Sequence, residues 1–207
     1  MSEVKAPDAS EIDFEKSGGL TPAIVQHARS GEVLMLGYMN ADAYAETLAS
    51  GRVTFFSRSK NRLWMKGESS GDVLELRGVA KDCDADALLV QAIPHGPTCH
   101  LGTKSCFGER PGPDLAFLAQ LQAVVDSRAD ADPEQSYVAK LFAKGVLKAA
   151  QKVGEEGVET ALAGAAEGDE ALLGEAADLI FHLIVLLRAR GLSLADAVRV
   201  LEGRHAG

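Results

Sequence analysis

The sequence predicts an α+β fold, in which a β-rich N-terminal domain is followed by an all-α helical-bundle domain. The short apolar runs of the first half are rich in β-branched residues and bounded by Gly, Asn and Asp, as is typical of strands. In the second half, apolar residues recur every three to four positions, which is typical of amphipathic helices. Between the halves, residues 108–114 hold two prolines and two glycines, which can continue neither a helix nor a central strand.

Each element follows from local signals. One helix interrupts the strands, from Asn40 as its N-cap to Gly51 just past its end. Gly191 can close the third helix of the second half, and Ser193 with Asp196 has the spacing of a capping box for the fourth. The expected strands are residues 33–39, 53–59, 63–66, 73–79 and 87–93. The expected helices after the boundary are residues 115–128, 137–166, 170–190 and 194–202. The predicted domains are residues 1–108 and 114–207, with a linker at 109–113.

Composition excludes several classes of protein. The 207 residues are 46% apolar, which is enough for a globular core. The net charge of −9, without a dense basic tract, argues against general nucleic-acid binding. The polar N-terminus lacks the apolar core of a signal peptide. The most apolar stretch, residues 179–187, is interrupted by His182 and is too short to span a bilayer.

All three cysteines, Cys83, Cys99 and Cys106, fall in one short stretch. Three thiolates can hold a zinc ion and leave its fourth position open for water, as in catalytic zinc sites. Three cysteines cannot all pair within one chain, so reduced thiols in a cytoplasm are expected. On spacing alone, three ordinary buried cysteines are the alternative.

Asp82, Asp84 and Asp86 alternate with Cys83 and Ala85. Their carboxylates are hard oxygen ligands suited to Mg²⁺. If this run is a strand, its three aspartates share one face and Cys83 lies on the other. A soft and a hard metal site in one segment indicate metal-assisted hydrolysis.

A second acidic group lies in the helical half. Glu156 and Glu159 are three residues apart and share a helix face, as do Glu175 and Asp178. A turn at residues 167–169 would make the two helices antiparallel and bring the four carboxylates together. Such repelling charges favour a divalent cation, Mg²⁺ or Mn²⁺. Solvated surface glutamates are the alternative.

Lysines and glycines mark the first of these helices. Four lysines recur at every fourth residue: Lys140, Lys144, Lys148 and Lys152. They would either receive a polyphosphate or form the solvated face of an amphipathic helix. Three glycines interrupt the same stretch: Gly145, Gly154 and Gly157. Each costs about 1 kcal/mol relative to Ala, which indicates a close approach of another helix or a ligand, or a break in the helix.

Motifs in both halves resemble known families. Residues 19–26 (GLTPAIVQ), 63–71 (LWMKGESSG) and 82–107, with DCDAD, PHGPTCH and SCF, resemble phosphoribosyl-AMP cyclohydrolase. Residues 152–159 (KVGEEGVE) and 175–182 (EAADLIFH) resemble phosphoribosyl-ATP pyrophosphohydrolase, an all-α nucleotide pyrophosphohydrolase. The first set is long and specific, whereas the glutamate motif is shared by several pyrophosphohydrolases.

The resemblance implies a bifunctional hydrolase of histidine biosynthesis. The helical half would remove pyrophosphate from phosphoribosyl-ATP, and the N-terminal half would open the adenine ring of phosphoribosyl-AMP at its N1–C6 bond. Family members build the zinc site between two subunits, with the first cysteine from one chain and the last two from the other. The resemblance therefore also implies a homodimer.

In the N-terminal half, zinc on the three cysteines would lower the pKa of its water towards about 7. His100 is the candidate for proton transfer or water orientation, with a structural role as the alternative. Trp64, Lys66 and Glu68 match substrate-region positions, although a lone Trp is more often part of a core.

In the helical half, the resemblance implies Mg²⁺ on the four carboxylates. Glu155 would be a further ligand or a base, and Lys152 would contact the substrate. His182 stands in an apolar run and is expected to be packed rather than catalytic.

Two positions depart from the cyclohydrolase pattern: Leu101, where Thr is usual, and Asp72, where Asn is frequent. Neither removes a proposed ligand, so an altered rate is the largest expected effect. A house-cleaning pyrophosphohydrolase for non-canonical nucleotides and a non-catalytic zinc-dependent module are the rival interpretations. The retention of every proposed metal ligand argues against the second.

Overall fold

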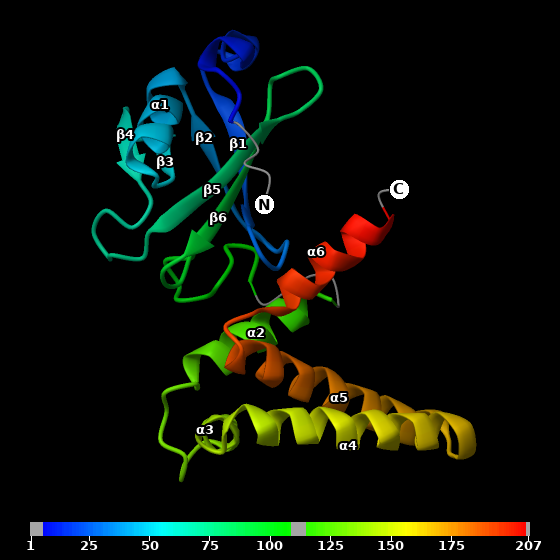
Figure 1. The fold of residues 1–207 in the computed structure, drawn as a ribbon. Coiled ribbons are helices and arrows are strands. Elements are labelled where there is room, and N and C mark those ends of the chain that lie inside the picture. Colours follow the sequence, from blue (N-terminus) through cyan, green and yellow to red (C-terminus); the bar gives the residue numbers. More distant parts are fainter. Residues whose placement is uncertain (1–5, 109–114, 206–207) are drawn as a thin grey trace. The chain divides into compact units, whose positions relative to one another are not determined.

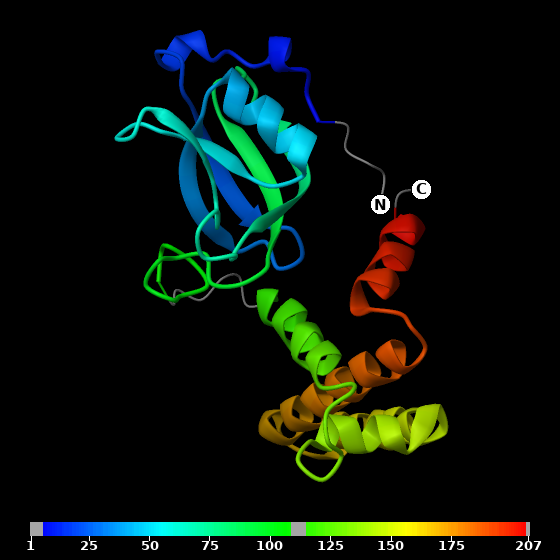
Figure 2. The same cartoon turned by 90° about the vertical axis from the view of Figure 1, so that its left-hand side faces the viewer.

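The computed structural model describes residues 6–108 and 115–205 of the chain (Figures 1 and 2). It divides into two compact units, Met1–Phe117 and Leu118–Gly207. The first unit contains all the described strands and the second contains helices only, so the predicted α+β architecture is confirmed. The linker predicted at 109–113 lies outside the described residues.

The N-terminal unit is built on a four-stranded sheet in the order β2-β1-β6-β5. β1 and β6 run parallel in its centre, and β2 and β5 pair with them antiparallel. β3 and β4 form a separate antiparallel hairpin. The strands are β1 (Thr21–His27), β2 (Val33–Met39), β3 (Thr54–Ser57), β4 (Arg62–Met65), β5 (Leu74–Lys81) and β6 (Leu88–Pro94). Each of the five predicted strands therefore has its counterpart.

Strand β1 is absent from the prediction. Its second residue is Pro22, which lacks the N–H group that a central strand uses on both sides. The parallel pairing with β6 begins one residue later, at Ala23 opposite Leu88, so Pro22 is aligned with β2 alone, opposite Tyr38. The proline therefore stands just before the point where the strand becomes central.

One helix, α1 (Ala41–Ser50), packs against β2, β3 and β4. Its predicted ends are confirmed: the Asn40 side chain accepts a hydrogen bond from the amide of Ala43, and Gly51 is left-handed, with φ 68°. Tyr44 and Phe55 are the largest side chains fully buried in the core beside it.

The sheet also carries an exposed apolar row. Ile24 of β1 stands opposite Leu36 of β2 and Leu89 of β6, and all three side chains are exposed. In β1 the exposed Ile24 lies between the buried residues Ala23 and Val25, as expected when successive side chains point to opposite faces. We call these three residues the open-face row.

The described residues from 115 to 205 form five helices: α2 (Ala116–Ser127), α3 (Tyr137–Ala143), α4 (Gly145–Ala166), α5 (Asp169–Ala189) and α6 (Leu194–His205). α4 and α5 lie side by side and are joined by two residues, so the predicted turn is confirmed (Figure 1). Apolar residues of α2, α3, α4 and α5 form the core: Val125, Val138, Leu141, Ala149, Ile184 and Val185.

The prediction of a single helix over residues 137–166 is wrong. Gly145 has a φ of 80°, which ends α3 before α4 begins. Three explanations were open for the glycines: a close approach of another helix, a close approach of a ligand, or a break in the helix. At Gly145 the break in the helix is the correct one. The break also divides the lysine stripe, because Lys140 lies in α3 whereas Lys148 and Lys152 lie in α4.

The last two helices end and begin as the sequence predicts. Gly191 is left-handed, with φ 72°, after α5. The amide and hydroxyl of Ser193 both donate to the carboxylate of Asp196 before α6. Among the described residues, no helix combines the length and the apolar character that a membrane span needs.

Candidate metal centres

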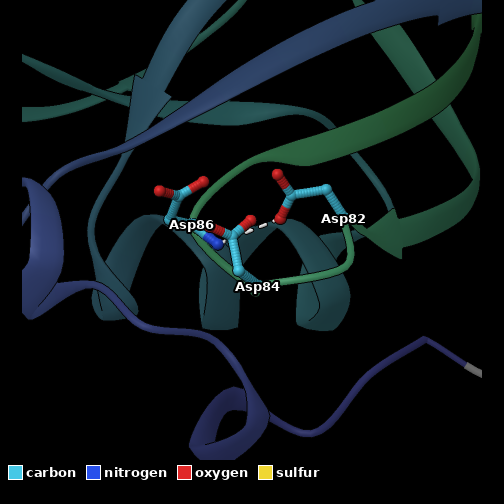
Figure 3. A group of neighbouring side chains, drawn as sticks. All are labelled: Asp82, Asp84 and Asp86. Carbon is cyan, nitrogen blue, oxygen red and sulfur yellow. Dashed lines mark hydrogen bonds between the residues drawn. The ribbon is translucent and has the colours of Figure 1, made fainter.

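The three aspartates lie in a turn (residues 82–86, the acid loop) that joins β5 to β6, so the alternative of a strand is wrong (Figure 3). A carboxylate oxygen of Asp82 accepts hydrogen bonds from the amides of Asp86 (3.0 Å) and Ala87 (3.1 Å). Ala85 is left-handed, with φ 62°. This folding brings one oxygen each from Asp82, Asp84 and Asp86 within 4.8 Å of one another.

A lysine from a distant segment neutralises the acid loop. The ammonium of Lys16 lies 2.5 Å from Asp84 and 2.8 Å from Asp86. Its hydrogen bond lowers the pKa of Asp84. Lys16 is 68 residues away from Asp84 in sequence, so no local pattern indicates this contact.

Two of the three cysteines meet in the loop after β6. The side chains of Cys99 and Cys106 lie close enough to affect each other's pKa, and we call them the thiol pair. The pKa of Cys99 is lowered mainly by a hydrogen bond from the Leu101 amide and, to a smaller extent, by one from the Thr103 hydroxyl. Burial raises the pKa of Cys106. Nδ1 of His100 lies 3.9 Å from the sulfur of Cys99.

Cys83 lies elsewhere in the same unit. It is exposed in the acid loop, before the start of β6, whereas the thiol pair follows the end of that strand. The seven residues of β6, at about 3.3 Å per residue, place the two ends of this strand roughly 20 Å apart. Among the described residues, no group of side chains that could share an ion contains the three cysteines.

Lys66 is a buried cation whose charge reaches the thiol pair. It is 8% exposed, and its ammonium donates to the carbonyl of Asp72 over 3.1 Å. Its positive charge opposes the effect of burial on the pKa of Cys106. Asp72, one of the two departures from the family pattern, lies against Gly96, and the other departure, Leu101, is 76% exposed.

The other two predicted substrate residues have partners in the same unit. Trp64 stacks on Phe55 of the core, with ring centroids 5.7 Å apart. Glu68 pairs with Arg62 over 2.5 Å, and this contact lowers the pKa of Glu68.

The helical unit gathers its carboxylates between α4 and α5. Oxygens of Glu156, Glu175 and Asp178 lie within 4.8 Å of one another, and Glu156 is only 5% exposed. The pKa of Glu159 is raised mainly by partial loss of hydration and, to a smaller extent, by the negative charges of Glu156 and Glu175. Glu159 is itself outside the described group of oxygens that could share an ion. We call the four residues the carboxylate cluster, and the three whose oxygens converge are donors that fit Mg²⁺ or Mn²⁺.

Lys152 is the cation of this cluster. Its ammonium lies 2.5 Å from Glu156 and 2.9 Å from Glu155, and these hydrogen bonds lower the pKa of both glutamates. Glu155 also accepts a hydrogen bond from Gln151. Within the part of the chain that the structure describes, Glu155 is outside the group of oxygens that could share an ion.

His182 is packed, as predicted, but it also touches the carboxylate cluster. Its Nδ1 lies 2.9 Å from the carbonyl oxygen of Asp178 and 3.6 Å from a carboxylate oxygen of Glu156. Its Nε2 lies 3.1 Å from the hydroxyl of Tyr137 at the start of α3. The sequence reasoning overlooked Tyr137, which joins this group only through tertiary packing.

Comparison with known proteins assigns both units. Residues 35–108 match the phosphoribosyl-AMP cyclohydrolase family, and residues 118–205 match the phosphoribosyl-ATP pyrophosphohydrolase family. The chain is 62% identical over 194 residues to the histidine biosynthesis bifunctional protein HisIE of Xanthomonas campestris, covering 94% of this chain and 93% of the relative. Proteins with the same description from Xylella fastidiosa (60% over 204 residues, 99% and 96% covered) and Escherichia coli K12 (57% over 195 residues, 94% and 96% covered) are also similar.

These matches first define a class, a metal-dependent hydrolase with two fused catalytic domains. The chain belongs to the family of bifunctional histidine-biosynthesis proteins that join phosphoribosyl-AMP cyclohydrolase to phosphoribosyl-ATP pyrophosphohydrolase. The resemblance seen in the motifs and the two hydrolase activities that it implies are confirmed.

Proposed function

We propose that the N-terminal half opens the adenine ring of phosphoribosyl-AMP at a zinc centre held by Cys83 and the thiol pair. The adjacent sulfurs of the thiol pair are the observation that carries this assignment, because soft thiolate donors suit zinc. The hydrogen bonds that lower the pKa of Cys99 favour its thiolate form. When bound, zinc supplies the Lewis acidity that makes water nucleophilic near neutral pH.

The zinc centre requires a homodimer in this proposal, with Cys83 from one chain and the thiol pair from the other. The length of β6 supports this arrangement, because it keeps Cys83 away from the thiol pair of its own chain. The exposed open-face row offers an apolar surface on which a second copy can pack.

Substrate binding in this half is assigned to the acid loop and to the segment around Lys66. The acid loop would hold Mg²⁺ beside the ribose or phosphate of phosphoribosyl-AMP, since its three oxygens already converge. The buried ammonium of Lys66, close to the thiol pair, would face the substrate together with Trp64 and Glu68. His100, 3.9 Å from the Cys99 sulfur, would transfer a proton or orient water.

In the helical half, we assign Mg²⁺ to the carboxylate cluster. When bound, the metal supplies positive charge to the phosphates of phosphoribosyl-ATP. Lys152 is placed to contact those phosphates, and Glu155, outside the cluster, to act as a base or as a further ligand. Loss of pyrophosphate yields phosphoribosyl-AMP, the substrate of the other half.

The remaining assignments rest on composition and motif positions. We place the protein in a cytoplasm, because three free cysteines suit a reducing compartment. Its partners are small nucleotides, and the net charge of −9 argues against nucleic acid. We keep 1–108 and 114–207 as the functional domains, with 109–113 as linker.

The test is a two-step assay combined with metal analysis of the full chain. Cys99→Ala should lose both ring opening and bound zinc while pyrophosphate release persists. Glu156→Gln is the reciprocal control, because it should lose pyrophosphate release and retain zinc. Active wild-type protein without zinc, or full ring opening by Cys99→Ala, would contradict the assignment.

A further inference from the structure

His182 is the buried titratable group that the proposed mechanism leaves unused. Its side chain is 6% exposed and lies in α5, four residues after Asp178. It contacts a residue of each of three helices: Tyr137 of α3, Glu156 of α4 and Asp178 of α5. Two of these three residues belong to the carboxylate cluster.

The neighbours of the imidazole fix its hydrogen-bonding state. A carbonyl oxygen can only accept, so Nδ1, 2.9 Å from the Asp178 carbonyl, carries the proton. The nearest carboxylate oxygen of Glu156 lies 3.6 Å from Nδ1, beyond hydrogen-bond distance, so the N–H is donated to the Asp178 carbonyl and the ring packs beside Glu156. Nε2 then accepts from the Tyr137 hydroxyl, which fixes the tautomer from the other edge of the ring.

This arrangement links the two helices that supply the carboxylate cluster. Glu156 is nearly fully buried, and one of its oxygens already contacts Lys152 at 2.5 Å. The Nδ1–H of His182 approaches the same oxygen from α5. The hydrogen bond from Lys152 and the imidazole packed against the same oxygen restrict the rotation of the carboxylate, and ligand-orienting groups of this kind strengthen metal binding.

We propose that His182, oriented by Tyr137, is a positioning residue of the pyrophosphohydrolase half, which fixes the Glu156 carboxylate for the divalent cation. This inference rests on the proposed function, in which the carboxylate cluster binds that cation. The imidazole does not contact the substrate in this role and transfers no proton. It acts through Glu156.

The test uses substitutions that separate ring shape from the Nδ1 donor. His182→Phe keeps an aromatic ring without nitrogen. His182→Asn places an amide donor near the position of Nδ1, whereas His182→Gln places its amide near Nε2. His205→Phe is the matched control, because exposed His205 in α6 makes the same Nδ1 contact with a carbonyl four residues earlier, at 2.9 Å.

The first readout is direct binding of Mn²⁺ to the metal-free full chain. Binding is measured through the electron paramagnetic resonance signal of the Mn²⁺ that remains free. Glu156→Gln identifies the part of the titration that belongs to the carboxylate cluster. The second readout is the Mg²⁺ concentration that gives half-maximal pyrophosphate release, measured with kcat and KM for phosphoribosyl-ATP. Ring opening by the same preparations controls for folding of the other half.

We expect His182→Phe to weaken Mn²⁺ binding at the cluster by about tenfold and to raise the Mg²⁺ requirement equally. His182→Asn should recover most of this loss, and Tyr137→Phe should show a smaller loss than His182→Phe. Unchanged Mn²⁺ binding in His182→Phe, or no advantage of His182→Asn over it, would overturn the inference. If His182→Phe does not fold, the comparison of His182→Asn with His182→Gln decides, because only the former keeps the Nδ1 donor.

The proposed function can fail separately. If Glu156→Gln binds Mn²⁺ as the wild type does, the assignment of the metal to the carboxylate cluster is wrong. If Glu156→Gln loses Mn²⁺ and His182→Phe does not, only the role of His182 is wrong.

Discussion

Mixing two inactive chains should restore ring opening. In one chain Cys83→Ala removes the exposed thiol of the acid loop, and in the other Cys99→Ala breaks the thiol pair. The two cysteines lie beyond opposite ends of β6, whose ends are roughly 20 Å apart, far more than the roughly 2.3 Å of a zinc–sulfur bond. A centre shared between two chains has no such restriction.

The size of the recovery follows from the symmetry of the proposed homodimer. After subunit exchange at equal concentrations, half of the dimers contain one chain of each kind, and each of these has one intact zinc centre out of two. Ring opening should therefore reach about a quarter of the wild-type rate per chain. The assay is the ultraviolet absorbance change on ring opening, with pyrophosphate release as an internal standard.

Two results would refute this reasoning. No recovery in a mixture that demonstrably exchanges subunits would mean that the centre does not combine Cys83 of one chain with Cys99 of another. Equal recovery in a mixture of Cys83→Ala with Cys83→Ser would also refute it, because neither chain then supplies the missing thiol.

Further predictions concern the helical unit and the acid loop. Glu156→Gln should abolish pyrophosphate release and leave ring opening intact when the two steps are assayed separately. Gly145→Ala should cost about 1 kcal/mol in chemical denaturation, because φ at this position is 80°. Ile184→Ala, at a fully buried site, should cost about 2–5 kcal/mol in the same measurement. Lys16→Met should lower Tm without magnesium and enlarge the rise in Tm on adding Mg²⁺, because Asp84 then lacks its cation; an equal rise in both proteins would contradict this.

Local signals were sufficient for most elements of the fold. The N-cap at Asn40 and the left-handed glycines at Gly51 and Gly191 correctly marked helix ends, because each depends on a single residue and its neighbours. The sequence does not predict β1, because Pro22 argues against a central strand. Whether Pro22 is tolerated depends on where pairing with β6 begins, which the sequence does not reveal. The helix break at Gly145 was one of several alternatives, since a glycine alone does not reveal its φ.

The acidic groups show what sequence spacing can and cannot predict. Glu156 of α4 converges with the two acids of α5 because helix periodicity and a short turn determine their positions, whereas Glu159 is outside this group among the described residues. The three aspartates of the acid loop come together because Asp82 accepts backbone hydrogen bonds that form a turn, and not because they share one face of a strand. The distance between Cys83 and Cys99 depends on the length and direction of β6, which spacing along the chain does not reveal.

Both acidic groups share one electrostatic arrangement, a lysine in direct contact with two carboxylates. Like charges held this close together repel each other. Lys16 offsets this repulsion in the acid loop and Lys152 does so beside the carboxylate cluster, so the acids can stay close together before any metal binds. At the acid loop the ammonium of Lys16 is partly exposed, where an ion pair contributes little, so a divalent cation can replace it at a small cost. Lys152 differs in that it holds Glu156 in place for the cation that the carboxylate cluster is proposed to bind.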